Sequence, residues 1–239
     1  MSTIDAERLN DLIRLGIETA GIKDFDVLME RMLGAARRFT RCDAGSVYIR
    51  RGDVLEFGFA QNDTLAARLE PGKKLAYKFF TVPVDNRSLA GYSASTGSML
   101  NIPDAYELPD GVPYHIDRSF DEMSGYRTRS ILTVPLATHR GDVIGVLQLI
   151  NAKGDDGRIV PFDPAIEPYV AYFASNAAAA LERAHLMRTV ILRMIGMAEL
   201  RDPRETGSHV NRVAGFAVEM YGTWARKIAS RASRGEPAS

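Results

Sequence analysis

The sequence predicts an α+β domain built around a long antiparallel hairpin, with helices before and after it. The central observation is residues 130–151, SILTVPLATHRGDVIGVLQLIN, in which two apolar runs flank the polar break 139–142. Gly and Asp in a short connection between β-branched runs indicate a hairpin turn. Apolar residues at helical spacing in 24–43 and 163–200 indicate helices on either side. Pro135 lacks an N–H for the sheet ladder, so we expect it at an edge position or a bulge.

Composition limits the classes of function that are open to this chain. The 239 residues are 46% hydrophobic and 25% charged, which is typical of a globular protein with one good core. Lys plus Arg and Asp plus Glu are 30 each, so the formal net charge is zero and nothing favours nucleic acid as a partner. The single cysteine, Cys42, excludes an intramolecular disulfide and indicates a reducing compartment. The N-terminus lacks the apolar core of a secretory signal and no apolar run has membrane-spanning length, so we expect no membrane partner and a cytoplasmic location.

The first half of the chain reads as helices followed by short strands. Hydrophobic periodicity predicts a helix at 4–20 and a second helix that starts at Asp24 and ends near 42–43. Alternating residues then predict a second hairpin with its turn at 51–53. The segments expected next are a polar loop with room for one short helix at 62–78, a strand at 79–84, a short helix at 87–96 ended by Gly97, and an extended piece at 99–102.

The second half combines a long polar loop with a long helix. Residues 103–129 are rich in Asp, Tyr, Pro and Gly, and a loop of this length is often a lid or a binding loop. After the central hairpin we expect a polar loop at 152–160 and then a helix capped by Asp163 and Pro164. The helix extends to Leu200 and has a narrow apolar seam that packs on its own domain or pairs two helices. The seam is Ala177, Leu181, Ala184, Met187, Ile191, Met194 and Ala198.

Three stretches, taken in order, resemble a GAF domain. They are RSLAGYSASTGSMLNIPDAY at 87–106, FDEMSGYRTRSILTVPL at 120–136 and GDVIGVLQLINAK at 141–153. Their order and spacing are similar to those of GAF domains in cyclic-nucleotide phosphodiesterases, and the resemblance covers residues 24–184. It implies a roughly six-stranded antiparallel sheet, with the first and last helices on one face and a ligand pocket closed by loops on the other. Residues 1–23 would then form a separate N-terminal helix.

Residues 199–221, ELRDPRETGSHVNRVAGFAVEMY, resemble the opening helix of an HD-GYP domain, a metal-dependent phosphodiesterase of cyclic di-GMP. The resemblance implies that Glu205 and His209 match metal ligands of that family, and positions i and i+4 share one helix face. However, none of the four histidines is followed by Asp, and no Gly-Tyr-Pro is present. A dinuclear site needs several more ligands. We therefore expect 185–239 to hold a signalling helix and a truncated HD-GYP first helix, with Glu205 and His209 vestigial and no hydrolytic activity in this chain alone.

The GAF resemblance also implies a set of ligand contacts. In nucleotide-binding GAF domains a helix start meets the phosphate, and the matching positions here are Leu89 and Ala90. The loop before the central hairpin supplies polar contacts, and its matching positions are Asp121, Ser124 and Thr128. Backbone N–H groups at a helix start suit phosphate, and carboxylate and hydroxyl groups suit the rest of a nucleotide in a closed site. The alternative is that the three polar side chains cap turns.

A second signature of the family, Asn-Lys-(n)-Phe-(3)-Asp-Glu, is present only in part. Asn151, Phe162 and Glu167 match it, whereas the lysine is displaced to Lys153 and Ile166 occupies the Asp position. In the family this pattern holds a supporting salt bridge. Its alteration here leaves open a small ligand other than a cyclic nucleotide.

Three classes of function follow. The first is a regulatory module that senses a small ligand, with a cyclic nucleotide as the candidate, dimerises through its N- and C-terminal helices, and is coupled to a missing or vestigial HD-GYP output. The second is an inactive fragment of a cyclic di-GMP phosphodiesterase, and the third is a ligand-free dimerisation scaffold. A haem sensor would need His115 as an axial ligand. A bilin sensor would need an attachment cysteine, and Cys42 lies outside the pocket segments.

Overall fold

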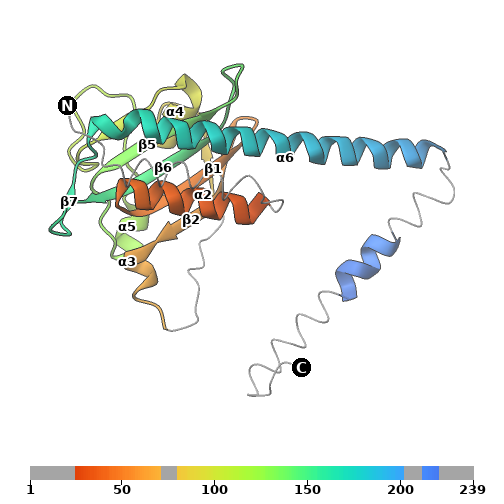
Figure 1. The fold of residues 1–239 in the computed structure, drawn as a ribbon, viewed down its shortest axis with the longest axis horizontal. Helices are drawn as coiled ribbons and strands as arrows, with labels where there is room; N and C mark the ends of the chain where they lie inside the picture. The colour runs from red at the N-terminus through yellow and green to blue at the C-terminus, as the bar shows by residue number, and fades with distance from the viewer. Residues whose placement is uncertain (1–24, 71–79, 202–211, 221–239) are drawn as a thin grey trace. The chain divides into compact units, whose positions relative to one another are not determined.

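The computed structural model describes residues 25–70, 80–201 and 212–220, and it centres on an antiparallel sheet (Figure 1). The strand order is β3-β2-β1-β6-β5-β4, and a short β7 pairs with β6. The α+β class and the roughly six-stranded sheet are therefore confirmed. The strands are β1 (Cys42–Arg51), β2 (Val54–Asn62), β3 (Thr81–Pro83), β4 (Leu100–Ile102), β5 (Ile131–Ala137), β6 (Val143–Lys153) and β7 (Ile159–Val160).

The helices lie on both sides of this sheet and have clear local signals. Ser88 caps α4 by accepting a hydrogen bond from Gly91 N, and Gly97 ends that helix with a φ of 70°. Asp163 caps a 3-10 turn at Pro164–Ile166 that leads directly into α6, as the Asp-Pro pair predicts. The helices are α2 (Phe25–Thr40), α3 (Asp63–Ala66), α4 (Leu89–Thr96), α5 (Ser119–Ser124) and α6 (Glu167–Arg201).

The main core lies between one face of the sheet and the helices α2 and α6, which cross that face side by side in Figure 1. Phe39 of α2 joins the two helices, with its ring centroid 5.5 Å from that of Phe173 and 5.8 Å from that of Tyr169. Val47, Leu147 and other alternate residues of the central strands point into this core. The prediction that the first and last helices share one face is confirmed for α2 and α6.

The central strands β1, β6 and β5 carry the residues that reach the opposite face. The register pairs Ser46 with Gln148 and Gln148 with Thr133, so these three side chains share that face. Pro135 pairs with Val146 of β6 but lies beyond the segment that β4 covers, which ends at Thr133. The expected edge position of Pro135 is thus confirmed, because its missing N–H falls where β5 has no second strand.

Two predicted boundaries are wrong. The second helix ends at Thr40 rather than at 42–43, because Arg41 takes a φ of 53° and Cys42 already opens β1. The segment 152–160 is not all loop, since β6 continues to Lys153 and residues 159–160 return as β7. The predicted helix at 4–20 lies outside the described residues.

The chain divides into two compact units, Met1–Ala184 and His185–Ser239. In the first unit, Ala177 and Leu181 of the predicted seam are buried, so this part of α6 packs on its own domain. In the second unit the seam residues Met187, Ile191 and Met194 are 49–59% exposed. Among the described residues, no helix combines the length and hydropathy needed to cross a bilayer.

Candidate ligand site

A row of three buried polar side chains crosses the second face of the sheet. Ser46, Gln148 and Thr133 lie side by side on β1, β6 and β5, and Gln148 Nε2 donates to Thr133 Oγ1 at 3.2 Å. All three are buried, with apolar residues two positions away on the same face of their strands. Polar groups are costly in such a place unless a hydrogen-bonding partner is supplied. This polar row therefore marks the part of the face that is best suited to a polar ligand.

Apolar rows flank the polar row on both sides. On one side Tyr48 and Val146 pack against Ala90 and Ala94 of α4. On the other side Ala44 and Ile150 pack around Leu65 and Tyr126, at the end of the loop 103–129. The polar row thus lies between the side of the face covered by α4 and the side covered by the long loop.

The start of α4 lies very close to the backbone at the end of β3. A Cβ at Gly91 would lie 2.4 Å from Pro83 O and 2.8 Å from Asp85 O, so only glycine allows this approach. The predicted phosphate contacts Leu89 and Ala90 form the first turn of α4, and both side chains are buried. Their side chains face two different apolar clusters, so only their backbone is suited to a polar ligand.

The loop 103–129 reaches the start of α4 directly. Ser88 and His115 form a parallel bridge, and His115 N donates to Arg87 O at 2.9 Å. Tyr92 of α4 and Tyr114 of the loop stack edge to face with centroids 5.0 Å apart. The loop is not structureless, since it contains α5 and packs on the apolar cluster of Leu89. Its role as a lid over the ligand site stays a prediction.

Asp121 is the polar hub of this loop. The residue is 7% exposed, and its carboxylate accepts hydrogen bonds from Thr128 N at 2.6 Å, Thr128 Oγ1 at 2.8 Å and Tyr106 Oη at 3.0 Å. Ser124 Oγ donates to Phe120 O at 2.6 Å and accepts from Tyr126 N. The structure therefore brings Asp121 and Thr128 together, and it uses all three predicted polar side chains within the loop. Their role as ligand contacts stays a prediction.

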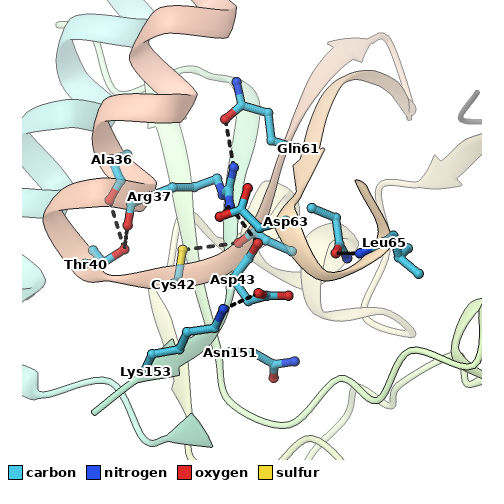
Figure 2. A network of polar contacts seen from close by, with 12 residues as sticks. Ala36, Arg37, Thr40, Cys42, Asp43, Gln61, Asp63, Leu65, Asn151 and Lys153 are labelled. Carbon is cyan, nitrogen blue, oxygen red and sulfur yellow. Dashed lines mark hydrogen bonds and ion pairs between the residues drawn. The ribbon is translucent and has the colours of Figure 1, made fainter. Parts of the chain in front are cut away.

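A second buried network anchors the end of the loop to the sheet, and Figure 2 shows the part of it that joins Asp43 to Lys153. Asp43 at the start of β1 has a side chain that is 2% exposed and forms an ion pair with Lys153 at the end of β6. Tyr126 Oη donates to Asp43 Oδ2 at 3.0 Å, and Asn151 Nδ2 donates to Tyr126 Oη at 2.9 Å. Arg37 of α2 donates to Asp43 O at 2.7 Å. Asp43 thus joins a helix through its backbone carbonyl, and the second strand and the loop through its buried carboxylate.

The electrostatics of this network keep Asp43 ionised. Burial alone raises the pKa of Asp43, but hydrogen bonds from Lys153, Thr64 and Tyr126 outweigh it, so the pKa lies below its ordinary value. Burial, and then the charge of Asp43, hold the pKa of Tyr126 well above its usual range. Tyr126 therefore stays a neutral hydrogen-bond donor.

Asn151 and Glu167 of the altered signature both have specific partners. Asn151, with a φ of 61°, donates to Arg127 O at 2.8 Å and accepts from Arg129 N at 2.7 Å, which fixes the return of the loop into β5. Glu167 Oε1 accepts from Asn101 Nδ2 at 2.8 Å, which ties β4 to the first residue of α6. The displaced Lys153 still forms an ion pair, but its partner is Asp43 and not a residue at position 166.

Sequence reasoning missed the polar row. Thr133 in SILTVPL and Gln148 in GVLQLIN are single polar residues inside apolar strands, and that pattern was the available signal. Neither stands out without the strand register that places them beside each other and beside Ser46. The vestigial metal candidates Glu205 and His209 lie outside the described residues. Within the described ranges, no group of three or more His, Cys, Asp and Glu side chains is placed to hold a metal ion.

Comparison with known proteins places this architecture. A family model described as GAF domain matches residues 24–181. The chain belongs to the GAF domain family. The GAF domain of the phosphoenolpyruvate-protein phosphotransferase of Acinetobacter is similar in structure, with a TM-score of 0.57 and 16% identity over 78% of this chain and 99% of that one. Free methionine-R-sulfoxide reductase of Neisseria meningitidis is similar as well, with a TM-score of 0.56 and 17% identity over 78% and 96% of the two chains. At these identities the likeness shows the fold alone.

Relatives of this GAF domain occur in much longer proteins. The cGMP-specific 3',5'-cyclic phosphodiesterases of Drosophila ananassae and Drosophila melanogaster are each 29% identical to it over 160 residues. The match covers 63% of this chain and 13% of those proteins. The chain is therefore a small-ligand regulatory module of the kind found in phosphodiesterases, and it corresponds to a small part of the relatives' length.

Proposed function

We propose that this GAF domain senses a small ligand bound on the second face of the sheet, between α4 and the loop 103–129. The observation on which this proposal rests is the buried polar row of Ser46, Gln148 and Thr133. Ligand sites are mostly apolar with a few convergent polar groups, and the polar row between two apolar rows has that composition. A ligand with donors and acceptors would exchange hydrogen bonds with these side chains, which an apolar ligand could not do.

A cyclic nucleotide is the ligand class that we propose first. The relatives named as cGMP-specific phosphodiesterases support it. The backbone of Leu89 and Ala90 at the start of α4 would meet the phosphate. Asp121 accepts three hydrogen bonds, and a carboxylate accepts about four. One acceptor position thus remains for a donor of the base, with Ser124 and Thr128 as the adjacent hydroxyl groups.

We propose further that α6 transmits the bound state to an output that follows it. Glu167 at its first residue is tied to β4, the strand after α4, so movement at the ligand site has a direct hydrogen-bonded route to the helix. The seam residues exposed in the second unit would pair with a second copy of the chain. The resemblance of 199–221 to an HD-GYP domain makes such a phosphodiesterase the proposed output.

The test is a thermal-shift screen of the full chain against cyclic AMP, cyclic GMP, cyclic di-GMP and haem. A ligand at a hundred times its Kd stabilises the folded state by about 2.7 kcal/mol, which is a shift of several degrees. We expect a cyclic mononucleotide to give this shift in the wild-type protein. Ser46→Ala, which removes one hydroxyl from the polar row, should reduce the shift by at least half.

Ser95→Ala is the matched control, because Ser95 is an exposed serine at the end of α4. It should leave the ligand shift unchanged. If no ligand in the screen shifts the melting temperature while the chain sediments as a dimer, the sensor proposal is wrong and the scaffold function takes its place. If Ser46→Ala and Ser95→Ala respond identically to a binding ligand, the ligand does not contact the polar row.

A further inference from the structure

Two exposed arginines of the loop 103–129 lie over the same aromatic ring. The Cζ atom of Arg118 is 4.2 Å from the ring centroid of Tyr106, and that of Arg127 is 4.5 Å from it. Both arginines are exposed. The two guanidinium groups cannot be further apart than these two distances together, so two positive charges are held near each other.

The ring that holds them is itself fixed. Tyr106 Oη donates to Asp121 Oδ2 at 3.0 Å, and Asp121 is buried and bonded to Thr128. The backbone of Arg127 is held as well, because its carbonyl accepts a hydrogen bond from the buried Asn151. A cation over an aromatic face is attracted by the ring, so the two side chains are ordered before any ligand arrives.

These two arginines differ from their neighbours in lacking an acidic partner. Arg129 pairs with Asp104 at 3.0 Å, and Arg87 pairs with Asp85 at 2.7 Å. In the part of the chain that the structure describes, no carboxylate lies within ion-pair distance of Arg118 or Arg127. Two like charges gathered on one ring repel each other, and a bound anion would offset that repulsion.

The geometry points to an anion subsite, formed by Arg118 and Arg127, that takes a phosphate group of a small molecule. The planar guanidinium group bonds phosphate through two parallel N–H donors, and Arg118 and Arg127 hold two such donor pairs on one ring. A long polyanion fits poorly, because the same loop has six carboxylates that would repel it. They are Asp104, Glu107, Asp110, Asp117, Asp121 and Glu122.

The subsite lies beside the α4 end of the ligand site. Tyr106 belongs to the apolar cluster that contains Leu89, the first residue of α4. Its position as the phosphate-binding entrance of that site rests on the proposed function. On that basis the natural ligand carries a phosphate, and Arg118 and Arg127 attract it before the loop covers it. The anion subsite itself rests only on the geometry of the two arginines.

The test is a ³¹P NMR titration of the full chain with inorganic pyrophosphate. We expect line broadening that gives a Kd for the wild-type protein, and a Kd at least about tenfold higher in Arg118→Gln and in Arg127→Gln, because each loses one charge-assisted contact. Arg140→Gln removes an exposed arginine from the hairpin turn between β5 and β6 and should leave the Kd unchanged. Circular dichroism would confirm that all three variants are folded. The subsite is wrong if the wild-type protein causes no broadening, or if all three variants bind pyrophosphate equally.

Thermal shifts of the same variants with cyclic GMP separate this inference from the proposed function. A cyclic GMP shift that is lost in Arg118→Gln and Arg127→Gln supports both. A shift that is unchanged in these variants removes the subsite from the ligand site and leaves the sensor proposal standing. Pyrophosphate binding that depends on the two arginines, without any nucleotide shift, supports the subsite and contradicts the cyclic-nucleotide proposal.

Discussion

Lys153 at the end of β6 forms an ion pair with Asp43 at the start of β1, and the Asp43 side chain is almost completely buried. The two residues are 110 positions apart in sequence and are brought together by the antiparallel pairing of the two strands. Through Tyr126 the same carboxylate holds the end of the loop 103–129. This pair therefore connects the stability of the sheet to the placement of the loop.

Removing the cation of this pair should destabilise the protein. Lys153→Met leaves a buried carboxylate without its main partner, and we expect the free energy of unfolding to fall by about 1–3 kcal/mol. This loss is smaller than for a fully buried ion pair, because the Lys153 side chain is 38% exposed. Urea unfolding measures the change. Arg158→Met is the control, since Arg158 and its partner Asp156 are both largely exposed, and it should change the free energy of unfolding by less than about 0.5 kcal/mol. Equal effects of the two substitutions would contradict the importance of the buried pair.

The pH dependence of stability should reveal the ionised state of Asp43. Its folded pKa lies below the unfolded value of about 3.9, so the pair contributes stability above that value and loses it as the pH falls toward the folded pKa. Asp43→Asn lacks this titration. Urea unfolding of the wild-type protein and of Asp43→Asn should be measured between pH 7 and pH 3. The difference between their free energies of unfolding should be constant above about pH 5 and should shrink below pH 4. A difference that stays constant down to pH 3 would show that Asp43 does not titrate as inferred.

Loss of one hydroxyl should loosen the loop. Tyr126→Phe removes the donor to Asp43 and the acceptor for Asn151, at a cost of about 1–2 kcal/mol. Hydrogen exchange should become faster at backbone amides in 120–129. Tyr172→Phe changes an exposed tyrosine of α6 and should have no effect on exchange in this segment. Unchanged exchange in Tyr126→Phe would mean that other contacts anchor the loop.

A methyl group at the start of α4 should destabilise the folded protein. Gly91→Ala places a Cβ 2.4 Å from Pro83 O, a backbone atom that cannot move alone, so we expect a destabilisation of about 1–3 kcal/mol. Calorimetry measures the melting temperature. Gly196→Ala is the matched control, because open space surrounds this glycine in α6 and alanine favours a helix by up to about 1 kcal/mol. A melting temperature that is unchanged in Gly91→Ala would contradict the close approach of α4 to the sheet edge.

The proposed pairing of two chains predicts a contrast between adjacent positions of α6. Ile191 lies on the predicted seam and Leu192 beside it, and both are exposed. Ile191→Asp should weaken the dimer by at least about tenfold, because it places a charge in an apolar helix interface. Leu192→Asp should have little effect. Sedimentation equilibrium measures both, and a wild-type chain that is monomeric at high concentration would rule out this pairing.

Much of the fold was predictable because its signals are local. Alternating apolar residues gave the two hairpins, Gly97 gave the end of a short helix, and Asp163 gave the start of the last one. The errors are of the same local kind. The helix ending at Thr40 stops early because the residue after it takes a left-handed conformation, and no turn residue such as glycine marks that position.

By itself, the sequence determined the α+β class, the order of the elements and the membership in the GAF family, because periodicity, capping and motif order act over short spans of chain. Only the tertiary structure decided which side chains meet. Strand register placed Ser46, Gln148 and Thr133 in one polar row, and it gave the displaced Lys153 a partner in Asp43. Within the loop 103–129, the tertiary structure joined Asp121 to Thr128. The strand pairings depend on contacts between distant segments, and the packing that selects one register among several is a property of the whole core.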